Sequence, residues 1–189
     1  MPCLRALAAG VAILAATPAS AATCRDVDFP ESVKTPAPLV LNGLGLRKAT
    51  FLAVRVYVAG LYLPQKSSDP REILGKDRPW HLLLHFVRDV DVSDIRDAFS
   101  EGFKKSAGDR LPALAPRIAA LEARMTDFKE GQTLAFANEP GKGVAVTVNG
   151  AAGPPIEGAD FASALLGIWL GPDPPNADLK TGLLGGKCE

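Results

Sequence analysis

Two polar side chains that could bind a ligand stand inside a segment that otherwise reads as buried strand. Arg47 and Tyr57 lie among valines, leucines and glycines in LNGLGLRKATFLAVRVYVAGLYLP, residues 41–64. An arginine in an apolar cleft needs a partner, because an unpaired buried charge is costly. Its planar fork suits a carboxylate or a polarised carbonyl, and the phenol can add one hydrogen bond. That partner is either a bound ligand or an acid of the chain itself, such as Asp89 or Asp91.

The same segment predicts two strands that position these side chains. A short turn at residues 48–50 would join them, and strict alternation puts the valines at 54, 56 and 58 on one apolar face of the second strand. Tyr57 then lies on the opposite face, beside small alanines that leave room for a guest. In this arrangement Arg47 lies near the start of the neighbouring strand rather than directly opposite Tyr57.

Other residues with chemical potential do not form a recognisable site. His81 and His85 share a strand face but stand roughly 13 Å apart, too far to bind one metal directly. Gly43 and Gly45 lack the third glycine and opening helix of a dinucleotide site, and the Lys-Ser/Thr pair of a phosphate loop. We therefore expect no metal and no cofactor, and we interpret the two glycines as positions of close backbone packing.

The remaining pattern predicts an α+β fold. Asp69 and Pro70 are typical of a helix start. Apolar residues recur at helical spacing from Val92, and a second helix follows through Ile118, with Pro116 near its start. The segment 132–150 alternates as a hairpin that turns at Pro140-Gly141, and a helix after residue 159 ends at Gly171. Strands, two helices, strands and helices in this order indicate a mostly antiparallel sheet rather than a βαβ series.

The N-terminus predicts export. Arg5, an apolar run over residues 6–16 and Ala19-Ser20-Ala21 form the three parts of a signal peptide, and the run is too short for a stable membrane span. We expect residues 1–21 to be removed, leaving one domain, residues 22–189, in the periplasm. Lys+Arg and Asp+Glu are both 21 in number, which gives no field that would attract nucleic acid.

Cysteine usage agrees with an oxidising compartment. Cys3 leaves with the signal peptide, so Cys24 and Cys188 remain at the two ends of the mature chain. Chain termini often lie close together, and a pair in an exported protein favours a disulfide. The sequence contains no CxxC spacing, so nothing in it suggests redox catalysis or a zinc site.

Four segments together resemble the chalcone isomerase-like family, in its bacterial exported branch. The resemblance covers roughly residues 39–185, and the order and spacing of the segments carry it. It implies an open-faced sandwich, in which helices cover one side of an antiparallel sheet and a ligand cleft lies between them. The segments are LNGLGLRKATFLAVRVYVAGLYLP, HFVRDVDVSDIRDAFSEGF, GQTLAFANEPGKGVAVTVNG and IEGADFASALLGIWLG.

The resemblance also implies roles for individual residues. Arg47 matches the arginine that orients and polarises the substrate in plant chalcone isomerases, and Tyr57 stands where those enzymes have a threonine. Fatty-acid-binding members of the family hold the carboxylate with an arginine and a tyrosine in these strands. A hydroxyl position of the later helix falls at Ala162 or Ser163, which makes Ser163 a further candidate for ligand binding.

The isomerase pattern is incomplete in this chain. True isomerases carry a tyrosine and, seven residues later, an asparagine near the start of the middle helix, where this sequence has Asp91 and Ala98. We therefore expect a protein that binds a small amphiphilic carboxylate of the fatty-acid type through Arg47 and Tyr57. Two alternatives stay open: an isomerase of chalcone-type enones in which Arg47 is the electrophilic aid, and a non-catalytic interaction protein of the cell envelope.

Overall fold

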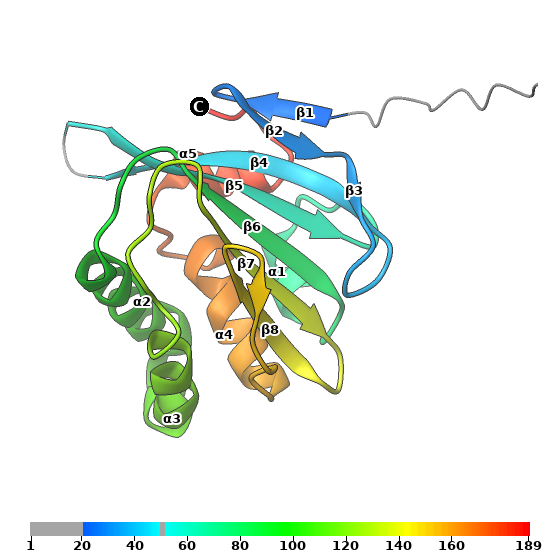
Figure 1. Ribbon diagram of the computed structural model, residues 1–189. Coiled ribbons are helices and arrows are strands. Elements are labelled where there is room, and N and C mark those ends of the chain that lie inside the picture. Colours follow the sequence, from blue (N-terminus) through cyan, green and yellow to red (C-terminus); the bar gives the residue numbers. More distant parts are fainter. Residues whose placement is uncertain (1–20, 50–51) are drawn as a thin grey trace, which may run out of the picture.

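The computed structural model describes residues 21–49 and 52–189, so the predicted signal peptide lies outside the described residues except for Ala21. Within them, a seven-stranded sheet has the order β3-β4-β5-β6-β7-β8-β9, and each strand pairs antiparallel with the next one along the chain. Figure 1 shows this meander, which confirms the predicted antiparallel α+β fold. The strands are β3 (Ser32–Val33), β4 (Leu39–Ala49), β5 (Val54–Leu63), β6 (Trp80–Phe86), β7 (Thr133–Glu139), β8 (Gly143–Val148) and β9 (Ala151–Ala152).

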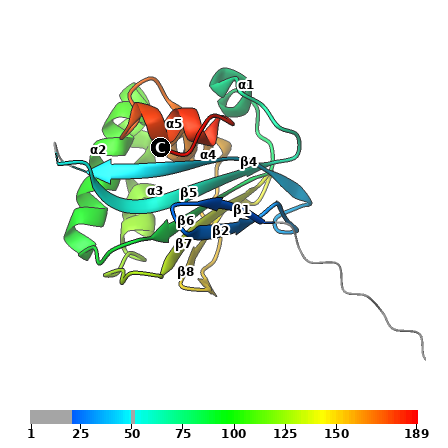
Figure 2. The same ribbon diagram turned by 90° about the horizontal axis from the view of Figure 1, so that it is seen from above.

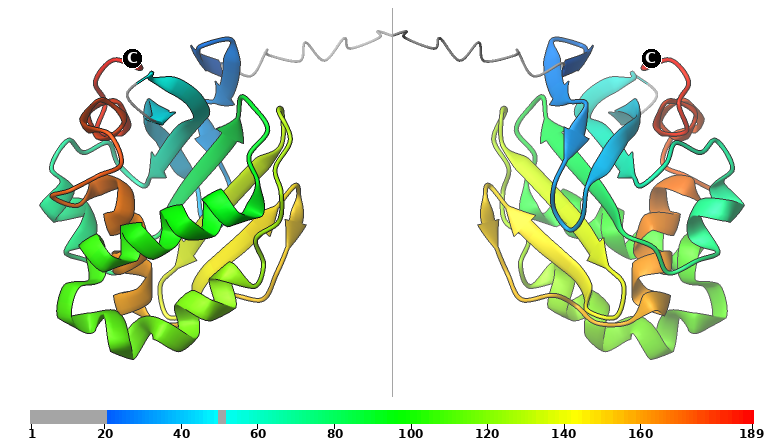
Figure 3. Two further views of the ribbon diagram at one scale, coloured as in Figure 1. Left: turned by 90° about the vertical axis from the view of Figure 1, so that its left-hand side faces the viewer. Right: turned by 90° about the vertical axis from the view of Figure 1, so that its right-hand side faces the viewer.

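The helices gather on one side of this sheet, and a separate N-terminal hairpin lies on the other. Figure 2 shows α1, α4 and α5 on the side opposite to β1 and β2, and Figure 3 shows the twisted sheet curling around the helices. The predicted helix that follows the first long helix begins earlier than expected, with Pro116 in its interior. The elements are β1 (Ala21–Cys24), β2 (Val27–Pro30), α1 (Pro70–Leu74), α2 (Val92–Ala107), η1 (Gly108–Arg110), α3 (Leu111–Glu122), α4 (Ala159–Leu170) and α5 (Ala177–Leu183).

The sheet has an apolar core on each face. The larger core lies between the sheet and the helices, where Phe86 stacks on Phe128 with ring centroids 4.3 Å apart. The smaller core lies under the β1–β2 hairpin, where Phe29 packs with residues such as Val58. The hairpin therefore covers part of the sheet face that an open-faced sandwich leaves uncovered.

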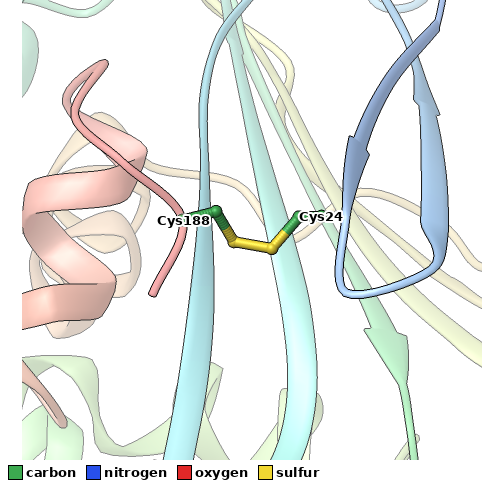
Figure 4. Close-up of a disulfide and its surroundings, with 2 residues drawn as sticks. All are labelled: Cys24 and Cys188. Carbon is green, nitrogen blue, oxygen red and sulfur yellow. A yellow bond between two sulfur atoms is a disulfide. The ribbon is translucent and has the colours of Figure 1, made fainter.

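A disulfide joins the ends of the described chain, as predicted. Cys24 is the last residue of β1, before the hairpin turn, and bonds to Cys188, beyond α5, with 6.1 Å between their Cα atoms (Figure 4). Cys24 is buried in the smaller core. The bond therefore fastens the hairpin, on one face of the sheet, to the segment that follows a helix on the other face.

Glycines on β4 allow α5 to lie directly against the strand. A Cβ atom at Gly43 would collide with the carbonyl oxygen of Gly182, and one at Gly45 would collide with that of Leu179. The buried Asn42 adds to this contact, because its amide nitrogen donates to the Leu183 carbonyl at 2.7 Å. The glycine pair is thus a site of close backbone approach, here between a strand and a helix.

A β-bulge in the β4–β5 pair overturns the strict alternation expected for β5. Arg47 pairs with Tyr57 and Lys48 pairs with Arg55, which leaves Val56 as an extra residue. A bulge turns consecutive side chains toward the same face. Val56 consequently packs against the helix-side core together with Tyr57, while Val58 belongs to the core on the other face.

Among residues 21–49 and 52–189, none of the helices combines the length and the hydropathy of a membrane span.

Burial of His81 predicts a pH-dependent stability. His81 lies beside Tyr62 on β5, and burial lowers its pKa from 6.5 to about 4. The unfolded chain protonates His81 near pH 6.5, whereas the folded chain does so only near pH 4. The stability that the neutral, buried imidazole contributes is therefore complete above about pH 6.5 and is lost as the pH falls toward 4. The loss reaches at most about 3 kcal/mol.

Urea unfolding at several values between pH 7 and pH 4 measures this effect. The free energy of unfolding of His81→Gln is expected to fall less steeply with decreasing pH than that of the wild type. His85→Gln is the matched control, which should keep the slope of the wild type. Equal slopes in the wild type and His81→Gln would contradict the assignment.

Candidate functional site

A cavity of about 550 Å³ opens between the sheet and the helices. Its walls come from β4, β5 and β6 near Arg47, Tyr57 and Phe86, from the length of α2, and from the segment 173–175 between α4 and α5. This volume falls in the range of small-molecule sites, roughly 300–1,000 Å³. The cavity lies between sheet and helices, where the resemblance implied a ligand cleft.

Arg47 and Tyr57 meet in this cavity as direct cross-strand neighbours. The register pairs the two residues, which corrects the expectation that Arg47 lies only near the start of the neighbouring strand. Side chains at such paired positions lie about 5 Å apart at their Cβ atoms. The bulge at Val56 explains the difference, because one extra residue before Tyr57 shifts the phenol into line with Arg47.

Arg47 is held by neutral oxygens rather than by an acid. Its Nη1 donates to the side-chain oxygen of Asn176 at 3.0 Å and to the carbonyl oxygen of Lys48. Among the described residues, Nε and Nη2 make no hydrogen bond to the protein. Donors on two of the three guanidinium nitrogens therefore remain for a ligand.

The acids considered as internal partners are engaged or placed elsewhere. Asp89 pairs with Lys129 at 2.9 Å, and that hydrogen bond holds the pKa of Asp89 below its ordinary value. Asp91 is the N-cap residue of α2. Within residues 21–49 and 52–189, no carboxylate forms an ion pair with Arg47.

Tyr57 is buried, and its oxygen accepts one hydrogen bond. The indole nitrogen of Trp169, on α4, donates to the Tyr57 hydroxyl at 2.9 Å. Burial raises the pKa of Tyr57, although the Trp169 bond and the Arg47 charge act in the opposite direction. The phenol therefore keeps its proton at neutral pH, and this proton is a donor.

Asn176 shows how the helix side of the site is built. It is the N-cap residue of α5, a position at which the side chain usually accepts a hydrogen bond from a backbone N–H of the first turn. Here the side chain makes no capping bond, and its oxygen accepts instead from Arg47 and from the Lys48 backbone nitrogen at 2.9 Å. The glycine contact between β4 and α5 sets this distance.

The mouth of the cavity carries charges that pair with one another. Lys105 on α2 contacts Glu101 at 3.4 Å and Asp173 at 3.3 Å. These bonds raise the pKa of Lys105, with the Asp173 hydrogen bond as the largest cause. The Asp173 contact links α2 to the segment that leads to Asn176, and such exposed pairs contribute little to stability.

The interior of the cavity is apolar and suits a hydrocarbon chain. Strands and helices both contribute to it, and the buried part of α2 forms one long wall. The apolar lining comprises Val54, Val56, Leu84, Phe86, Val90, Ile95, Ala98, Phe99, Leu134 and Ile168.

Ser163 does not lie with Arg47 and Tyr57. It lines a second, smaller cavity of about 260 Å³ at the other end of β6, near Trp80 and Asn138. Its hydroxyl donates to the Leu74 carbonyl oxygen at 3.2 Å. The position on α4 that the resemblance suggested thus faces α1, because helix packing rather than the sequence match decides which residues of α4 face the main cavity.

The sequence-based prediction missed Trp169 and Asn176. The asparagine had a local signal, since it precedes the helical segment ADLKTGL as an N-cap residue would. Trp169 had none, because an aromatic residue in an apolar helix ordinarily reads as core. Within the described part of the chain, no group of three or more His, Cys, Asp or Glu side chains could hold a metal ion.

Comparison with known proteins identifies the family. Residues 21–185 match the family described as chalcone isomerase-like, so this chain belongs to that family. Among solved structures, it is similar to a fatty-acid binding protein of Arabidopsis thaliana, with a TM-score of 0.70 and 17% sequence identity over 87% of this chain and 96% of that chain. At this identity the likeness shows the shared fold. No curated protein matches the sequence.

Proposed function

We propose that this protein binds an amphiphilic carboxylate of the fatty-acid type in the main cavity. Arg47 would pair with the carboxylate, Tyr57 would donate a hydrogen bond to it, and the apolar side chains between sheet and helices would hold the tail. The observation that carries the proposal is the pairing of Arg47 and Tyr57 in one cavity, with no acid of the described residues on the guanidinium. The similar Arabidopsis structure is named a fatty-acid binding protein, which supports the same ligand class.

The electrostatics of the site agree with an anionic head group. Every guanidinium hydrogen is a donor, and Arg47 has no acceptor to offer. A carboxylate matches the guanidinium fork, and charge-assisted hydrogen bonds are about twice as strong as neutral ones. Arg47 is partly buried and its hydrogen-bond partners among the described residues are neutral oxygens, so a bound anion would stabilise the site.

Binding fits the cavity better than chalcone isomerisation does. Ala98 lines the cavity, and the resemblance puts an asparagine at this position in true isomerases. The cavity therefore offers no side-chain hydrogen bond there. We do not propose Ser163 as a ligand residue of the main cavity, since its hydroxyl faces the second one.

We further propose that the protein is exported to the periplasm after loss of residues 1–21. The disulfide between Cys24 and Cys188 supports an oxidising compartment. Ala21 begins β1, so cleavage after it leaves the rest of the hairpin in place.

One preparation tests both proposals. The full chain would be expressed and purified, its intact mass measured, and its organic extract analysed by mass spectrometry. We expect the mass of residues 22–189 with one disulfide, a co-purified fatty acid, and a rise in melting temperature with C12 to C18 acids. The absence of lipid together with no thermal shift would overturn the ligand assignment. An intact mass that retains residues 1–21 would overturn export, and Arg47-dependent chalcone cyclisation in a spectrophotometric assay would favour the isomerase alternative.

A further inference from the structure

Tyr57 accepts a hydrogen bond from Trp169, and this bond limits where its own hydroxyl hydrogen can point. An indole N–H can only donate, so the Tyr57 oxygen is the acceptor in the 2.9 Å bond from Trp169. The hydroxyl hydrogen must then point away from Trp169. Because both side chains are buried and Tyr57 lines the cavity, the geometry leaves the phenol as a donor toward a ligand.

The packing of both rings fixes the direction in which the Tyr57 hydroxyl donates. Tyr57 meets Phe86 edge-on at 5.8 Å between ring centroids. Trp169 lies between Phe99 and Phe136, at 6.2 and 5.9 Å. Neither ring can turn away without disturbing the core, and only the C–O bond of the phenol retains freedom. Trp169 removes that freedom by occupying the oxygen.

Arg47, which also lines the cavity, is a donor as well. Arg47 stands directly opposite Tyr57 in the β4–β5 register, and a guanidinium has no acceptor. A head group that accepts only, such as a carboxylate, satisfies both side chains. An alcohol brings a hydrogen of its own that finds no acceptor on Arg47 or on Tyr57, and an unpaired buried donor is costly.

We propose that Trp169 is a specificity-determining residue of the head-group site, which selects an ionised carboxylate over an alcohol by holding Tyr57 as a donor. This inference rests on the proposed binding of an amphiphilic carboxylate in the same cavity. Trp169 acts through Tyr57, so it is a positioning residue rather than a direct ligand contact.

The test compares dodecanoic acid with dodecan-1-ol, which share a chain length and differ in the head group. Titration calorimetry would give the ratio of the two dissociation constants for each variant. In Trp169→Phe the Tyr57 oxygen becomes free to accept from the alcohol, so the preference for the acid is expected to fall about tenfold. In a Tyr57→Phe background the same substitution should leave the ratio unchanged.

The chain supplies matched controls. Trp80→Phe alters the other tryptophan, which lines the second cavity, and Tyr62→Phe alters the other tyrosine, which lies in the core on the opposite face of the sheet. Both should keep the wild-type ratio. An unchanged ratio in a folded Trp169→Phe protein would overturn the inference, as would an equal fall in the Tyr57→Phe background, which would indicate an effect of cavity shape.

A measurement on the unaltered protein covers the case in which Trp169→Phe does not fold. The two indole N–H resonances can be followed by NMR during titration with dodecanoic acid. The Trp169 resonance is expected to shift and the Trp80 resonance to stay, and the reverse result would overturn the inference. A wild type that binds neither compound would overturn the proposed function and this inference with it, whereas binding without dependence on Trp169 overturns the inference alone.

Discussion

Replacement of Arg47 by glutamine is expected to weaken the binding of dodecanoic acid about 100-fold. Hydrogen bonds to a charged group contribute about 1.5–3 kcal/mol each, and the glutamine keeps a polar side chain without the charge or the fork. The affinity of Arg47→Lys should lie between those of the wild type and Arg47→Gln, since an ammonium keeps the charge but cannot bind a carboxylate in the same bidentate way. Titration calorimetry at fixed ionic strength measures all three affinities.

Arg55 provides the matched control for this experiment. It lies on the same strand pair, opposite Lys48 in the register, and its side chain is exposed. Arg55→Gln therefore removes the same charge without touching the cavity. Equal losses in Arg47→Gln and Arg55→Gln would mean that general electrostatic attraction, and not a head-group contact, drives binding.

Removal of the disulfide is expected to have the largest effect on stability. The bond joins residues 164 positions apart, so it restricts nearly the whole unfolded chain. The loop-entropy relation gives about 5 kcal/mol for a loop of this length, as an upper value. The double variant Cys24→Ser/Cys188→Ser should lose several kcal/mol of unfolding free energy in urea denaturation.

The reductant response separates this effect from local disturbance by serine. Reducing agent should lower the urea midpoint of the wild type toward that of the double variant and leave the variant unchanged. A wild type whose midpoint does not respond to reduction of the bond would contradict the prediction. The β1–β2 hairpin should loosen first, because the bond fastens it to the segment after α5.

Local sequence patterns predicted most of the fold. Asp69 and Pro70 indicated the start of α1, and the Asp69 side chain indeed accepts from the Arg71 backbone nitrogen at 2.9 Å. Apolar spacing from Val92 predicted α2, and Pro140-Gly141 predicted the turn between β7 and β8. These features depend on neighbours within a few residues, which a sequence displays directly.

The site was less predictable because it depends on partners distant in sequence. The bulge at Val56 arises only when β4 and β5 pair, and strict alternation in the β5 sequence cannot reveal it. Asn176 is 129 residues from Arg47, and Trp169 is 112 from Tyr57. The sequence could not show that Ser163 lies apart from Arg47 and Tyr57 for the same reason, since the rotation of α4 follows from packing against α1 and α2.

The contact between β4 and α5 has a consequence for how the binding site can change. Exchanging one apolar side chain for another in the tail region would reshape the cavity and admit a longer, shorter or bulkier guest. A single methyl group at Gly43 or Gly45 would instead push α5 outward, and the amide that steadies the guanidinium would move with it. The tail end of the cavity can thus change gradually. The head end is constrained, because the contact between β4 and α5 has no room for a side chain at Gly43 or Gly45.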